Sequence, residues 1–182
     1  MKKKLIIIVS AVIIILVGIM IYFYLTKEKA VSVEYQPEEE ITNEQMRQTI
    51  VSLYYKNKET KELMPEGRVI DSKELLENPY KKLVELLIEA PKNDKLESAI
   101  PEGTKVNNAK IEGDIVYLDL SKEFIENHAG GQEEESLTIY SIVNTLTELT
   151  EVNSVKILID GKEDESFKDG KINFSEPFLK IN

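Results

Sequence analysis

The sequence contains no cysteine and no tryptophan, and it has a single histidine. The absence of cysteine excludes disulfide bonds, thiolate metal sites, a cysteine nucleophile and a lipid attached to cysteine. The absence of tryptophan weighs against a glycan-binding site. A folded domain in this chain must therefore be held together by its hydrophobic core alone.

Basic residues are too few to balance the acidic ones. The 33 acidic and 23 basic residues give a formal net charge of −10. All the acidic residues follow residue 25, whereas three of the basic ones, Lys2, Lys3 and Lys4, precede it. Because an acidic domain repels nucleic acid and anionic lipid headgroups, we expect neither as a ligand. The charge favours solubility and is compatible with basic partners.

One long hydrophobic run is present, at residues 5–25. It carries no charge, and a helix of this length rises about 30 Å, the thickness of the hydrocarbon core of a bilayer. The lysines before it, and the near balance of charge after it, predict a cytoplasmic N-terminus and an extracytoplasmic C-terminal part. A cleaved signal peptide is the alternative, but its apolar core is only about 7–15 residues and no A-x-A-like cleavage site is found. We therefore predict an uncleaved single-pass anchor in the cell membrane.

The residues after this run divide into a spacer and a domain. Residues 26–47 are polar and acidic with little periodicity, which predicts a flexible linker; such a coil spans roughly 25 Å. The remaining residues are sufficient for one domain with a core. The predicted organisation is a basic stub with a transmembrane anchor (1–25), a linker (26–47) and one folded domain (48–182).

Hydrophobic periodicity in the folded part alternates between strand and helix. Apolar alternation and β-branched residues predict strands at residues 50–55, 68–70, 106–111, 115–120 and 155–159. A turn containing Pro65 and Gly67 is expected before the second strand, and a hairpin turn at residues 112–114. Asp160-Gly161 is expected to end the last strand, and residues 167–182 could add a short strand and a tail.

Two amphipathic segments lie between these strand pairs. Asn78-Pro79 predicts the start of one helix, and the three acids at residues 133–135 predict the start of the other. Their apolar stripes are Leu76, Tyr80, Leu83, Val84 and Leu87, and Ile139, Ile142, Val143, Leu146 and Leu149. The order β-β-α-β-β-α-β predicts an α+β fold, a small mixed β-sheet with two helices packed on one face and the other face open.

Five blocks in this order resemble a known domain. They are Leu53-Tyr54-Tyr55, LESAIPEGTKV (96–106), VYLDLSKEF (116–124), YSIVNTLTE (140–148) and VKILIDGK (155–162). Together they resemble the GerMN domain of spore formation and germination proteins, over roughly residues 48–175. The resemblance implies a fold similar to the ring-building motifs of secretion-system and spore-channel proteins, a part in assembling envelope complexes, and no known catalysis. The best-known member has two such domains and a lipid anchor, whereas this sequence predicts one domain and a transmembrane helix.

Few residues form a pattern that predicts chemistry. His128 lies beside Ala129-Gly130-Gly131 without a spaced partner to orient it, so we interpret it as an exposed loop residue. Ser121 and Ser141 could in principle serve a hydrolytic triad, but neither lies in a nucleophile elbow. Gly130-Gly131 lacks the spacing of a phosphate-binding loop and is followed by acids.

The acidic clusters have simpler interpretations than a site. One cluster could suggest calcium, but it lacks the alternating ligand spacing of a calcium loop and is interpreted as a solvated turn. Its members are Glu163, Asp164, Glu165 and Asp169. Asp119 could line a cleft, although it or Ser121 is better explained as a turn cap. Residues 133–135 mark a helix start or, alternatively, a contact for a basic partner. We predict no catalytic, cofactor-binding or metal-binding residues and no cofactor.

The leading hypothesis is a non-enzymatic interaction module, bound to the membrane and extracytoplasmic. Its partners would be envelope proteins or further copies of itself, with spore formation or germination as the expected setting. Because Tyr54 and Tyr55 alternate across a strand, one should face the core and the other the open sheet face, where it could serve a protein contact. The alternative is an exported module that binds a ligand or a cell-wall glycan in a pocket, and an exported hydrolase is a further alternative.

Overall fold

The computed structural model describes residues 2–25, 47–163 and 165–180, and for residues 2–12 it describes the backbone only. Helix α1 (Lys2–Leu25) coincides with the predicted anchor. The side chains in the first part of the predicted span, and the predicted linker up to residue 46, lie outside the described residues. In the part of the chain that is described, no helix qualifies as a candidate membrane span.

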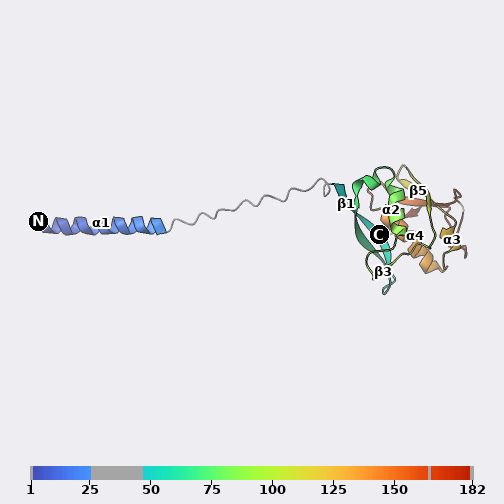
Figure 1. The fold of residues 1–182 in the computed structure, drawn as a ribbon, viewed down its shortest axis with the longest axis horizontal. Coiled ribbons are helices and arrows are strands. Elements are labelled where there is room, and N and C mark those ends of the chain that lie inside the picture. Colours follow the sequence, from blue (N-terminus) through green and yellow to red (C-terminus); the bar gives the residue numbers. More distant parts are fainter. Residues whose placement is uncertain (1, 26–46, 164, 181–182) are drawn as a thin grey trace. The chain divides into compact units, whose positions relative to one another are not determined.

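The folded domain contains two β-sheets rather than the single mixed sheet predicted above (Figure 1). The first has the order β2-β1-β3 and is antiparallel: β1 (Gln48–Asn57), β2 (Leu63–Asp71) and β3 (Leu96–Glu97). The second has the order β4-β5-β6-β7, with β5 and β6 parallel. Its strands are β4 (Val106–Glu112), β5 (Ile115–Leu120), β6 (Ser154–Ile159) and β7 (Phe178–Leu179).

The sheets remain separate because other elements pair with β1. The main-chain N–H of Tyr54 donates to the Thr145 hydroxyl of α4 (Gln132–Leu146) at 3.0 Å. β3 pairs with Lys56 and Asn57, the last residues of the same strand. No strand of the second sheet can therefore pair along this part of β1, and the prediction of one continuous sheet was wrong.

The second strand is longer than predicted and includes the expected turn residues. β2 begins at Leu63, so Pro65 and Gly67 lie within it. Pro65 is directly opposite Tyr54, whose N–H points away from β2, so this is a non-hydrogen-bonded pair. Since β2 is an edge strand, the proline nitrogen faces outward and costs the ladder no bond.

Both predicted helices are present. Helix α2 (Pro79–Ile88) is capped by Asn78, whose side chain accepts from the N–H of Lys81 at 3.0 Å, and Pro79 is its first residue. Leu76 precedes the helix and is 80% exposed, so its assignment to the buried stripe was wrong. In α4 the predicted stripe is buried as far as Leu146, and Leu149 lies beyond the helix end. The core lies between these helices and the sheets; Figure 1 shows α2 and α4, which contact each other.

The tight turns follow from residues that accept positive φ. Gly113 (φ 65°) leads the two-residue turn between β4 and β5, as the hairpin prediction required. Asp160 (φ 47°) and Gly161 (φ 77°) form a turn with positive φ at both central residues after β6, closed by the Ile159–Lys162 bridge. The two short helical segments are the 3₁₀ helix η2 (Ser72–Leu75) and α3 (Glu123–Glu126).

A buried arginine joins β2 to the end of α2. Arg68 is 4% exposed, and Nη2 donates to the Glu66 carboxylate at 2.8 Å and to the carbonyl of Ala90 at 3.2 Å. Its Nη1 donates to the carbonyl of Leu86 at 3.2 Å. The hydroxyl of Tyr55 donates to the same carbonyl at 2.9 Å. These donors satisfy carbonyls that a helix end leaves without partners.

The C-terminal segment is held by aromatic packing. Phe167 and Phe174 are fully buried, with their ring centroids 5.2 Å apart. Phe124 of α3 lies 5.5 Å from Phe167. This small cluster attaches the chain after β6 to the rest of the domain, and β7 then adds the short strand expected near the C-terminus.

Candidate functional site

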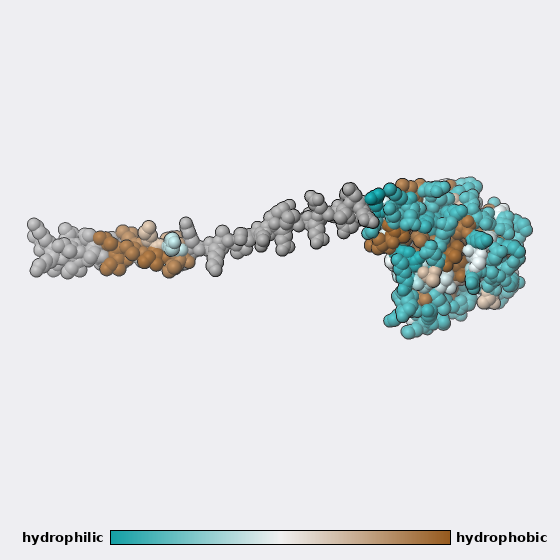
Figure 2. Space-filling view, in the orientation of Figure 1, coloured by the Kyte–Doolittle hydropathy of each residue, from teal (hydrophilic) through white to brown (hydrophobic). Residues whose placement is uncertain are grey.

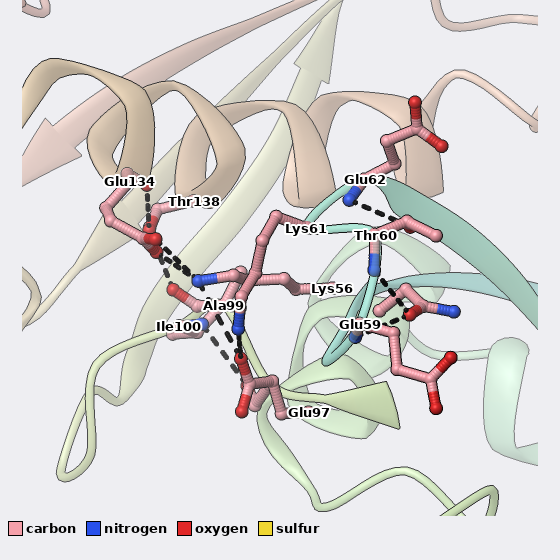
Figure 3. Close-up of polar contacts among 12 residues, drawn as sticks. Lys56, Glu59, Thr60, Lys61, Glu62, Glu97, Ala99, Ile100, Glu134 and Thr138 are labelled. Carbon is pink, nitrogen blue, oxygen red and sulfur yellow. Dashed lines mark hydrogen bonds and ion pairs between the residues drawn. The ribbon is translucent and has the colours of Figure 1, made fainter. Parts of the chain in front are cut away.

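Polar side chains from distant parts of the chain converge on one small pocket. Its volume is about 190 Å³, and it lies between the end of β1, the segment after β3, the loop after α3 and the first turns of α4. Figure 3 shows Lys56, Glu97, Glu134 and Thr138 pointing toward one another there. The full lining is Lys56, Glu97, Ser98, Ala99, Ile100, Pro101, Asn127, His128, Ala129, Glu134 and Thr138.

Lys56 supplies the positive charge of this pocket. It is 7% exposed, and its Nζ lies 2.6 Å from both carboxylate oxygens of Glu134 (Figure 3). Glu97 is a second, longer partner at 3.7 Å, and it also lies 4.0 Å from Lys61. Charge-assisted bonds of this length are the strong ones. The lysine is therefore occupied by its own chain rather than exposed for a substrate.

His128 is buried, not exposed as the sequence suggested. Its Nδ1 accepts from the N–H of Gly130 at 2.9 Å, and Nε2 lies 2.9 Å from the Thr138 hydroxyl. That hydroxyl donates onward to the carbonyl of Ala99 at 2.7 Å, so Nε2 carries the proton and the ring is neutral. Phe167 packs on the imidazole with centroids 4.6 Å apart. The expectation failed because residues far along the chain cover the ring.

Burial lowers the pKa of the His128 imidazole, and the Glu134 carboxylate opposes this only in part. Because the folded value lies below the usual one of about 6.5, the unfolded chain binds the proton more readily. This contribution to stability is present above about pH 6.5 and is lost as the pH falls through the folded pKa. Between pH 7 and pH 5, we expect the free energy of unfolding of His128→Gln to fall by about 1 kcal/mol less than that of the wild type. Urea unfolding followed by tyrosine fluorescence measures this, and equal losses would contradict it.

The three acids at the start of α4 have three different environments. Glu133 is exposed, and Glu134 binds Lys56. Glu135 is fully buried, and among the described residues no donor reaches its carboxylate oxygens, which lie beside the Asp169 carboxylate. Burial raises the pKa of Glu135, and the neighbouring Asp169 carboxylate raises it further. Both effects favour the protonated, neutral form of the Glu135 carboxyl.

The two serines considered for a hydrolytic triad make hydrogen bonds to main-chain groups of the fold. The Ser121 hydroxyl accepts from the N–H of Lys105 at 3.0 Å, and the Ser141 hydroxyl donates to the carbonyl of Thr138 at 3.0 Å. Neither is a hydrogen-bond partner of His128 among the described residues, so the structure does not bring a triad together. Asp119 accepts from the N–H of Gly161 at 2.9 Å and thus supports the turn after β6.

The acidic turn after β6 is divided among separate ion pairs. Glu163 lies 3.9 Å from Lys156, and Glu165 lies 3.3 Å from Lys162, while Asp164 lies outside the described residues. Over the ranges that the structure covers, no group of three or more acidic or histidine side chains is placed to hold a metal ion. Gly130 and Gly131 both have positive φ and lead into α4.

The two tyrosines of β1 differ as predicted. Tyr55 is fully buried, and burial raises its pKa to about 12. Tyr54 is half-buried, and its hydroxyl donates to Glu148 at 3.1 Å. Sequence reasoning missed Lys56, Arg68, Thr138 and the burial of Glu135. The partner of Lys56 lies 78 residues away along the chain, beyond the reach of any local spacing, whereas Arg68 has a local signal in Glu66, two residues before it on the same strand.

Comparisons with known proteins agree with this fold. The family model "Germane: Sporulation and spore germination" matches residues 52–165, more than half of the chain. The structure of the tandem GerMN domains of the sporulation protein GerM from Bacillus subtilis is 24% identical, with a TM-score of 0.63. The match covers 77% of this chain and 48% of that one, so the present chain spans about half the length of the tandem structure.

Two further solved structures are similar. The first GerMN domain of the same B. subtilis protein is 21% identical (TM-score 0.60, covering 72% of this chain and 97% of that one). A putative lipoprotein from Clostridium perfringens is 28% identical (TM-score 0.51, covering 78% and 99%). A search of curated proteins found no match. On the extent of the family match, the chain belongs to the Germane family of sporulation and spore germination proteins.

Proposed function

We propose that this chain is a membrane-tethered interaction module that helps to assemble protein complexes of the cell envelope in sporulation or germination. Membership of the Germane family supports the biological setting. The apolar run at residues 5–25, preceded by three lysines, supports a membrane anchor with the folded domain outside the cytoplasm. A tether of this kind raises the local concentration of the domain, so weak lateral contacts suffice for assembly.

The observation that carries a non-enzymatic role is the saturation of the polar pocket. Lys56 is bonded to Glu134, both ring nitrogens of His128 are engaged, and Thr138 bridges His128 to a carbonyl. Catalysis by a nucleophile requires a base within reach of it. In this pocket the groups instead satisfy one another, which supports a rigid scaffold whose work is done by its surface.

The size of the polar pocket argues against a small-molecule ligand bound there. Sites for small molecules typically enclose about 300–1,000 Å³ and are lined largely by apolar and aromatic groups. The pocket beside Lys56 has a volume of about 190 Å³, and among the described residues that line it His128 is the only aromatic one. These properties disfavour a metabolite or glycan in this pocket; larger surface hollows, of about 430–570 Å³, lie beside α4, near β3 and beside α2.

Cysteine labelling of the full chain tests the anchor and its direction, since the natural sequence has no cysteine to interfere. We expect Thr60→Cys, in the exposed turn between β1 and β2, to react with a membrane-impermeant maleimide in intact cells. Lys3→Cys is the control and should react only after lysis. Full protection of Thr60→Cys, or a chain trimmed near residue 25 and free in the medium, would contradict the proposed topology.

Lysine-reactive cross-linking in intact cells tests the assembly role. We expect the full chain to be recovered from membranes as cross-linked oligomers or joined to an envelope protein. A variant that lacks residues 1–25 is the control, and it should lose most cross-links because the tether no longer concentrates it. Absence of any cross-linked species from the full chain would contradict the proposal.

A further inference from the structure

One edge of β1 is only partly used. Tyr54 and Lys56 direct their main-chain groups away from β2, toward α4 and β3. Ile50 and Ser52 have the same phase along the strand, so their N–H and C=O groups point to the same side. Among the described residues, the structure gives these groups no hydrogen-bond partner. The first half of β1 therefore presents an open sheet edge.

The outer face beside this open edge carries no charge between Asp71 at one end and Lys56 at the other. Directly opposed pairs on the outer face of β1 and β2 are Ile50 with Val69, Ser52 with Gly67, and Tyr54 with Pro65. Ile50 is 72% exposed and Val69 is 52% exposed. Figure 2 shows apolar residues gathered on the side of the domain where β1 begins. An uncharged face on so acidic a chain is the place where two copies can approach without repulsion.

We infer that this edge joins two copies of the chain, with β1 pairing antiparallel to β1 of the second copy about a two-fold axis at Val51. This inference rests on the proposed function and names the surface that it uses. In this register Ile50 is opposite Ser52 of the second copy, so the free N–H and C=O groups of both residues become paired. Gln48 of the second copy would fall opposite Tyr54, whose edge α4 already occupies, so the pairing extends only over residues 49–53 and the bond between Tyr54 and Thr145 is kept. A strand that pairs with itself in this way forms an isologous interface.

Side-chain shape fits the same register. On the outer face, each Ile50 lies over Ser52 and beside Gly67 of the second copy. A large exposed side chain is thus placed on two small ones, in both directions at once. The sheet continues as β2-β1-β1-β2 across the axis. A different protein would need a strand edge with this spacing of large and small residues, whereas a second copy supplies it by symmetry.

Disulfide trapping of the full chain in membranes tests the register. Val51 meets its symmetry mate in a non-hydrogen-bonded pair, where Cα atoms are about 4.5 Å apart and suit a disulfide. Val69 is more exposed but lies on β2, which places its two copies about 14 Å apart across the axis. We expect V51C to give about tenfold more disulfide-linked dimer than V69C after mild oxidation. Random collision would favour V69C instead.

Two further variants make the result independent of any fold defect in V51C. The double variant I50C/S52C changes only outer-face residues and should also form dimers. Adding I50K to V51C should reduce the yield of disulfide-linked dimer about tenfold. The matched control, L76K at an exposed leucine outside β1, should change that yield less than about twofold. Dimer yields for V51C and I50C/S52C no higher than for V69C would overturn the inference. If lysine cross-linking still captured oligomers in that case, the proposed assembly role would be supported and only the β1–β1 interface would be rejected.

Discussion

Replacing Arg68 with methionine is expected to lower the free energy of unfolding by about 3–5 kcal/mol, because removing one partner of a buried ion pair leaves the other charge without compensation. Glu66 would keep its charge in a site where its side chain is only 10% exposed. The carbonyl of Ala90 would lose the Arg68 donor, and that of Leu86 would be left with the Tyr55 hydroxyl. Urea unfolding at pH 7 measures the change.

The pKa of Glu66 gives this prediction a second readout. Burial pushes that pKa upward, but the N–H of Asn93 and the guanidinium of Arg68 outweigh burial, and the pKa is lowered. A lowered carboxyl pKa adds stability above the usual value of about 4.3, and this is lost as the pH falls through the folded pKa. The stability of R68M should therefore depend less on pH in the acid range than that of the natural chain.

Two comparisons distinguish the buried pair from ordinary surface charge. The double variant E66L/R68M should recover part of the loss, since an apolar pair can replace a buried ionic one at little cost. The exposed pair of Lys81 and Glu85, 3.9 Å apart, is the matched control, and K81A should change stability by less than about 0.5 kcal/mol. A loss below about 1 kcal/mol for R68M would show that the arginine is dispensable.

Replacing Glu135 with glutamine is expected to stabilise the domain by about 1–3 kcal/mol at pH 7, the scale of an unsatisfied buried polar group. The folded pKa of Glu135 is raised, so its carboxyl contributes fully to stability only below the unfolded value. That contribution is lost as the pH rises through the folded pKa. The advantage of E135Q should therefore be small near pH 4 and should grow toward pH 7 and above.

Glu133 provides the matched control for Glu135. It lies in the same first turn of α4 but is exposed. An acid there interacts favourably with the positive end of the helix dipole, so E133Q should cost about 0.3–1 kcal/mol. Opposite signs for the two neighbouring substitutions are the expected result. A destabilised E135Q, or a difference from wild type that does not vary with pH, would contradict the raised pKa of Glu135.

Features determined by neighbouring residues were predictable from the sequence. Asn78-Pro79 marked the start of α2, the stripe from Ile139 to Leu146 identified the buried face of α4, and the turns at Gly113 and Asp160-Gly161 ended their strands as expected. Each depends on backbone preference or on side chains within one or two turns of chain. These features can be recognised because the residues that determine them are close together in the sequence.

Features determined by distant residues were not predictable. The burial of His128 depends on Phe167 and Thr138, and the neutralisation of Lys56 depends on a glutamate 78 residues later. The division into two sheets depends on the contacts that β1 makes with the Thr145 hydroxyl of α4 and with β3. The same sequence pattern would suit one sheet or two, because pairing partners are chosen by packing and not by periodicity.

The outward-facing nitrogen of Pro65 limits how far β1 and β2 can grow by strand addition. A strand that adds beside β2 would find a missing donor at Pro65, whereas the opposite side of β1 is open at Ile50 and Ser52. The sheet of β1 and β2 can therefore add one strand beside β1 but no further strand beside β2. Pro65 thus allows one pairing beside β1 and prevents open-ended strand addition among molecules that are held close together.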